Sequence, residues 1–86
     1  MAADLIDELR HLLVASLRLD RDPGSIAPDA LLFGGELGLD SLDAVQFLSA
    51  IEKHFGIEVP DRELGRSALD TLSSIAGMLT RLRVSR

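Results

Sequence analysis

The residues of this chain best suited to chemistry surround Ser41, whose hydroxyl stands between the carboxylates of Asp40 and Asp43. Such a hydroxyl can act as a nucleophile when a base within hydrogen-bond reach removes its proton, or it can carry a covalently attached group. The two histidines do not supply that base. His54 lies thirteen residues further along the same expected helix, about 20 Å away, and nothing places His11 beside Ser41. We therefore expect an attachment point, with no catalytic residue, in a protein that is not an enzyme.

Other motifs that bind phosphate or metal are weak in this chain. Gly34, Gly35 and Gly38 only loosely resemble a phosphate-binding loop, because the Gly-Lys-Ser/Thr ending is missing and no strand is expected before them. The acidic residues of the same region do not alternate as they do in a calcium-binding loop. The chain has no cysteine, which excludes disulfides and thiolate metal sites. No metal site is predicted.

The segments on either side of Ser41 place it at or near the start of a helix. Gly34, Gly35 and Gly38 make the preceding segment an irregular loop, whereas residues 42–55 contain no Gly or Pro and repeat apolar residues at helical spacing. Serine and aspartate are favoured at this position because they cap free backbone N–H groups, so one interpretation is that Ser41 is only an N-cap. The other is that its hydroxyl is exposed and modified. A phosphate attached there would face the positive end of the helix dipole.

The expected helix from Ser41 to about His54 has one core face and two apolar residues outside it. At about 100° per residue, the core face comprises Ala44, Phe47, Leu48, Ile51 and Phe55. Leu42 and Val45 fall outside that arc, beside Glu52. They predict a docking patch next to the serine. The alternative is that they contact the preceding loop or are ordinary exposed hydrophobic side chains.

A first amphipathic helix is expected from Ala3 to Leu17, and Asp20–Gly24, which contains Pro23, is expected to end it. The connection that follows runs to about Leu39, which is long for a small domain unless it is held in place. Four hydrophobic residues are expected to hold it by entering the core: Ile26, Leu31, Leu32 and Phe33.

The C-terminal part predicts a C-cap at Gly56, a short helix over Arg62–Leu69 and a last helix that reaches about Leu82. Asp70 or Thr71 caps the last helix. Its expected inward residues are Leu72, Ile75, Ala76, Leu79 and Leu82. The fold class is therefore all-α, a small bundle of three main helices plus one short helix.

The composition describes one small domain, residues 1–86, with 47% hydrophobic residues to form a core. Its net charge of −5 argues against nucleic-acid binding. No apolar run is long enough to span a membrane, and the acidic N-terminal segment is unlike a signal peptide, so a cytoplasmic protein is expected. Residues 29–61 hold seven acids and one base, which favours partners with basic docking surfaces. A monomer is expected, because there is no apolar heptad seam.

The residues around Ser41 closely resemble the acyl carrier protein family. The stretch Leu37-Gly38-Leu39-Asp40-Ser41-Leu42-Asp43 is similar to that family's attachment motif, and the resemblance continues in register through Asp61. It spans essentially the whole chain and implies an acyl-carrier-like bundle. It also implies that Ser41 receives phosphopantetheine from coenzyme A through a dedicated phosphopantetheinyl transferase. The thiol of that arm would hold acyl groups as thioesters.

The resemblance further implies roles for other residues. Those expected to help dock the transferase, and the enzymes that load, condense, modify or transfer the acyl group, are Asp40, Leu42, Asp43, Val45 and Glu52. Family members can also shelter an acyl chain inside the bundle. Candidates for lining such a cavity are Phe33, Ala44, Ile51, Val59, Leu64 and Ala68. The same residues would form the core of any helical bundle, so both interpretations stay open.

Several alternatives remain for the biological role. Gln46 and Lys53 stand where fatty-acid carriers usually have acids, so a specialised-lipid or polyketide pathway is as well supported as fatty-acid synthesis. A peptidyl or aminoacyl carrier typically has Gly-Gly before the residue that precedes the serine, whereas this chain has Gly38-Leu39 and an acid at Asp43. We therefore favour an acyl cargo. An unmodified helical interaction module is the alternative from a different class.

Overall fold

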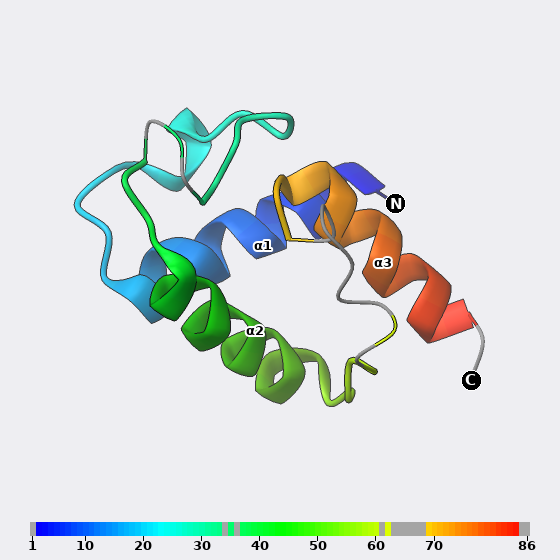
Figure 1. Cartoon of the computed structure of the whole chain (residues 1–86). Coiled ribbons are helices and arrows are strands. Elements are labelled where there is room, and N and C mark those ends of the chain that lie inside the picture. The colour runs from blue at the N-terminus through cyan, green and yellow to red at the C-terminus, as the bar shows by residue number, and fades with distance from the viewer. Residues whose placement is uncertain (1, 34, 36, 61, 63–68, 85–86) are drawn as a thin grey trace.

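The protein, seen in a computed structural model, is a helical bundle whose described residues form three α-helices (Figure 1). The structure describes residues 2–33, 35, 37–60, 62 and 69–84. The helices are α1 (Ala2–Leu17), α2 (Ser41–Phe55) and α3 (Leu72–Val84), and a 3₁₀ turn, η1 (Pro23–Ser25), lies between the first two. The all-α prediction is confirmed. The short helix expected over Arg62–Leu69 falls outside the described residues except at its two ends.

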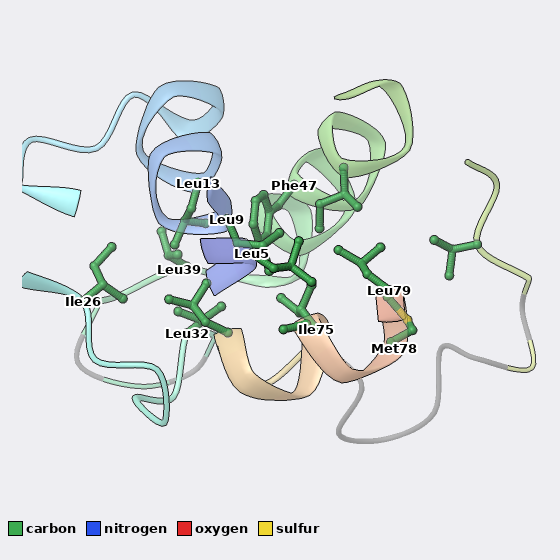
Figure 2. Packing of buried hydrophobic residues seen from close by; sticks show 14 residues of the cluster. Leu5, Leu9, Leu13, Ile26, Leu32, Leu39, Phe47, Ile75, Met78 and Leu79 are labelled. Carbon is green, nitrogen blue, oxygen red and sulfur yellow. The ribbon is translucent and has the colours of Figure 1, made fainter. Parts of the chain in front are cut away.

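Helix α1 is the central element of the bundle, because both α2 and α3 pack against it. Leu5, Leu9 and Leu13 of α1 are buried and meet Phe47 of α2 and Ile75 of α3 in one apolar cluster (Figure 2). The sequence pattern did not identify Met78, which is also fully buried. In the described part of the chain, no helix is long and apolar enough to cross a membrane.

Helices α1 and α2 end in the same hydrogen-bond pattern with different residues. In α2, the left-handed residue is Gly56 (φ 66°), and the Ile57 N–H donates back to the Glu52 carbonyl at 3.1 Å. In α1, the equivalent left-handed residue is Arg18 (φ 52°). The Leu19 N–H that follows it donates to the Val14 carbonyl, five residues back, at 3.0 Å. The expected end of α1 at Leu17 is confirmed. The residue that ends it is Arg18, however, which precedes the expected Asp20–Gly24 segment, and that segment leads into η1.

Two hydrophobic side chains of the connection between α1 and α2 anchor it in the core. Ile26 and Leu32 are buried, as expected, and Phe33 is half-buried against the core. Leu31, in contrast, is 46% exposed, so the expectation that it enters the core is wrong. Because Leu32 fills the core position, its neighbour Leu31 points the other way.

Backbone hydrogen bonds tie this connection to the start of α3. The Leu32 N–H donates to the Asp70 carbonyl at 2.7 Å, and the Ser73 N–H donates to the Pro28 carbonyl at 3.0 Å. Such pairing satisfies polar backbone groups that a partly buried loop would otherwise leave without partners. Thr71 caps α3, since its hydroxyl accepts from the Ser74 N–H at 3.0 Å. Of the two caps proposed for this helix, Thr71 is the one observed.

Two glycines give a matched test of this fold. Gly56→Ala places a Cβ in the left-handed region, with no atom within 4 Å, so the cost of about 1 kcal/mol in unfolding free energy comes from backbone conformation alone. Gly77→Ala, within α3 and exposed, is expected to raise stability by about 0.5–1 kcal/mol. Urea unfolding followed by circular dichroism measures both. Equal effects in the same direction would contradict the assigned left-handed C-cap.

Candidate functional site

The N-terminus of α2 is capped by Asp40 and not by Ser41. The Asp40 Oδ1 accepts from the Asp43 N–H at 3.0 Å, and the Asp43 Oδ2 accepts from the Asp40 N–H at 3.0 Å. These reciprocal bonds form a capping box, which satisfies two backbone donors at once. The interpretation of Ser41 as only an N-cap is therefore wrong, because its neighbour already does this work.

Ser41 is the first residue inside the helix, and it is exposed. Among the described residues, none makes a hydrogen bond with its hydroxyl. The approach to it is tightly folded: Phe33 and Leu39 form an isolated parallel bridge that closes the intervening loop. Within that loop, Gly38 has φ 70° and its N–H donates to the Gly35 carbonyl at 3.1 Å. The chain thus presents one unengaged hydroxyl from a positioned turn of helix.

The predicted docking residues do not all lie in one place. Leu42 and Val45 are 76% and 65% exposed, so their outward orientation is confirmed. Asp40 and Asp43 share the first turn with them, and each uses one carboxylate oxygen in the capping box. Glu52 is about 16 Å further along the helix axis than the serine. These first-turn residues therefore form one acidic and apolar face beside Ser41.

Glu52 also has a structural contact. Its Oε2 accepts from the Val59 N–H at 2.8 Å, and its side chain is half-buried. This bond holds the extended segment after α2 against the helix end. A change at Glu52 would therefore alter the local fold as well as the charge of the face.

The two histidines lie away from the serine. His54 Nε2 is 2.7 Å from the Glu8 Oε2 and so joins α2 to α1, while His11 Nδ1 donates to the Asp7 carbonyl at 2.8 Å. Within the described ranges, no group of His, Cys, Asp and Glu is arranged to hold a metal ion. The His54 contact joins two helices and the His11 contact stays within α1, so neither of these contacts involves Ser41.

The six residues predicted to line an acyl cavity have mixed positions. Ile51 and Val59 are buried in the core, and Phe33 and Ala44 are half-buried. Leu64 and Ala68 lie outside the described residues. A bundle cavity therefore stays a prediction.

The capping box predicts a loss of stability for one of two adjacent alanine substitutions and almost no change for the other. Asp40→Ala removes the side-chain acceptor and is expected to lower the unfolding free energy by about 1 kcal/mol. Ser41→Ala removes no cap, so a change within about 0.5 kcal/mol is expected. Asp40→Asn, which keeps an acceptor oxygen, is the matched control. A larger loss in Ser41→Ala than in Asp40→Ala, measured by urea unfolding, would contradict the assignment.

Comparison with known proteins is consistent with this geometry. Residues 7–79 match the family model described as a phosphopantetheine attachment site. An acyl carrier protein from Campylobacter hominis is 39% identical over 64 residues, which is 70% of this chain and 72% of that protein. A mitochondrial relative from Schizosaccharomyces pombe is 43% identical over 51 residues, 59% of this chain; the aligned part is only 45% of that protein.

A solved structure extends the similarity to the fold. It is the crystal structure of an engineered Bradyrhizobium japonicum glycine:[carrier protein] ligase complexed with a carrier protein from Agrobacterium tumefaciens and AMP. A chain of that structure superposes with a TM-score of 0.72 and 30% identity, over 93% of this chain and 99% of the other. The fold, the attachment-site match and the sequence similarity agree: this chain belongs to the acyl carrier protein family, and its prosthetic group is covalently bound phosphopantetheine.

Proposed function

We propose that Ser41 carries the phosphopantetheine arm, and that the protein shuttles acyl groups as thioesters between enzymes of fatty-acid, specialised-lipid or polyketide biosynthesis. The observation that supports this most directly is the exposed Ser41 hydroxyl at the first position of α2, which the capping box does not use. If the hydroxyl were the N-cap, its modification would remove the hydrogen bond that it accepts from the helix backbone. This one is available for a phosphate ester without such a loss.

The site fits the arm chemically. The amides of the first turn that the cap leaves unused face the same end of the helix as the serine oxygen, so a phosphodiester there meets the positive end of the helix dipole. Neither of the described histidine contacts involves Ser41, and the sequence contains no cysteine. A separate phosphopantetheinyl transferase would therefore activate the hydroxyl, and the arm would supply the thiol.

The first turns of α2 form the proposed docking face for that transferase and for the acyl enzymes. Leu42 and Val45 offer apolar contact, and Asp40 and Asp43 offer negative charge to a basic partner surface. Glu52 extends the acidic character toward the other end of the helix. Because both first-turn carboxylates are held by backbone bonds, they are ordered before a partner arrives.

Modification at Ser41 is tested with coenzyme A and a broad-specificity phosphopantetheinyl transferase. We expect the intact mass to rise by one phosphopantetheine, and peptide mapping to locate it on Ser41. Ser41→Ala is expected to show no addition while keeping its circular dichroism spectrum and unfolding midpoint. Addition to the Ser41→Ala protein, or none to folded, unmodified wild type, would contradict the proposal and favour an unmodified interaction module.

An aminoacyl cargo is the second candidate, and the structural similarity to a chain from a glycine:[carrier protein] ligase complex favours it. We expect the holo protein not to accept radiolabelled glycine from that ligase and ATP, because Gly38-Leu39 and Asp43 differ from the usual aminoacyl-carrier pattern. The Agrobacterium tumefaciens carrier protein is the positive control and Ser41→Ala is the blank. Transfer comparable with the positive control would replace the acyl assignment with an aminoacyl one.

A further inference from the structure

A pocket of about 450 Å³ lies in the connection between α1 and α2, outside the helical core. Its described walls are mostly apolar, with Ile26, Leu31 and Leu37 among them, and Arg21 is the charged residue among those described. Pockets of this size with apolar walls and few polar groups are typical of small-ligand sites. The chemistry of the walls therefore suits a ligand with an apolar body and one negatively charged group.

Arg21 is oriented within the pocket by a neighbouring serine. Its Nε donates to the Ser25 Oγ at 3.2 Å, and the Ser25 hydroxyl donates to the Asp22 carbonyl at 2.6 Å. No described carboxylate lies within ion-pair distance of the Arg21 guanidinium. A guanidinium presents its two terminal NH₂ groups as donors in a planar fork that matches a carboxylate.

The apolar walls are held in place by contacts outside the pocket. The Ile26 carbonyl accepts from the Arg10 Nε at 2.8 Å. This bond holds the wall of the pocket that follows η1 against α1. On the other side, Gly35 packs so closely on Leu31 that a Cβ there would meet the Leu31 carbonyl oxygen at 2.9 Å. Leu31 is nevertheless 46% exposed, although the residue after it is fully buried. An exposed leucine that lines a formed pocket has a direct explanation if a ligand covers it.

The pocket is within reach of an arm on Ser41. Leu37 lines the pocket and precedes the serine by four residues, which span at most about 14 Å of extended chain. The phosphopantetheine arm has about as many chain atoms as four to five residues, so its extended length is about 16 Å. The thioester end of the arm can therefore arrive at the Leu37 side of the pocket.

We propose that this pocket receives the cargo of the carrier's own arm, and that it selects acyl groups with a short apolar body and a terminal carboxylate. The carboxylate pairs with Arg21, and the methylene groups contact Leu31 and Leu37. A cargo ending in an ammonium group, such as an aminoacyl group, is repelled by the same guanidinium. This inference rests on the proposed attachment to Ser41 and adds the class of cargo.

The experiment compares two cargoes of equal shape on the same protein. The broad-specificity phosphopantetheinyl transferase transfers the acylated arm to Ser41 of the apo protein from glutaryl-coenzyme A or from its terminal carboxamide, and adenosine 3′,5′-bisphosphate leaves. Intact mass verifies each product. Heteronuclear NMR then follows the methyl groups of Ile26, Leu31 and Leu37 and the side-chain N–H of Arg21. We expect the glutaryl form to shift these signals relative to the holo form, with about three-fold lower occupancy for the carboxamide, as for an exposed ion pair.

Arg21→Gln is expected to make the two cargoes indistinguishable, while Arg18→Gln, a nearby charge loss outside the pocket, keeps the difference. Arg21 is exposed, so the variant is expected to keep the wild-type unfolding midpoint. The inference is overturned if the glutaryl cargo shifts only signals beside Ser41 or those of Ile51 and Val59, or if its preference survives in Arg21→Gln. Absence of the loaded mass would instead overturn the attachment to Ser41 and, with it, this inference.

Discussion

The reciprocal hydrogen bonds between Asp40 and Asp43 are the interaction on which the site depends. They begin α2 at a defined residue and satisfy two backbone donors, at 3.0 Å each. Because the side chains on both sides of Ser41 do this work, the serine is at the helix start without being part of the cap. Had the serine been the cap, its modification would have removed a contact that stabilises the helix. The same two carboxylates also give the surface beside the serine its negative charge.

The second requirement is that the segment leading into α2 is held in place, and contacts of the connection between α1 and α2 meet it. Arg10 holds the connection from α1, while the backbone of Leu32 and Pro28 pairs with the start of α3. The Phe33–Leu39 bridge then closes the last loop before the capping box. A long connection without regular structure is costly in conformational entropy, and these bonds and buried side chains offset part of that cost. They also leave room for the pocket that contains Arg21.

The helices and the outward face of α2 could be predicted because they rest on periodicity. The spacing of Phe47 and Ile51 requires a buried face, and Leu42 and Val45 then have to lie outside it. The features that were missed depend on backbone geometry with a weak local signal. Asp40 and Ser41 are both good capping residues, so only the three-dimensional register separates them. An arginine in the left-handed position at the end of α1 is unusual, since glycine is the expected residue there.

Leu31 shows a different limit of prediction. Adjacent residues in an extended connection point to opposite sides, so when Leu32 enters the core, Leu31 cannot. A run of apolar residues in a loop does not reveal which of them is buried. The resemblance to a family motif predicts the family, which the family match confirms, and it proposes Ser41 as the attachment residue. The pocket beside Arg21, in contrast, depends on how the described residues from Arg21 to Leu37 pack on one another. That arrangement has no periodic signature.

The small size of the exposed face on α2 has a kinetic consequence. Leu42 and Val45, with the acids around them, occupy little more than one helical turn. A standard stable interface buries about 800 Å² on each partner, far more than one turn can offer. Negative charge speeds the encounter with a basic partner, but so small an apolar contact gives a short residence time. A face of this size therefore favours brief encounters with a basic partner over a long-lived complex.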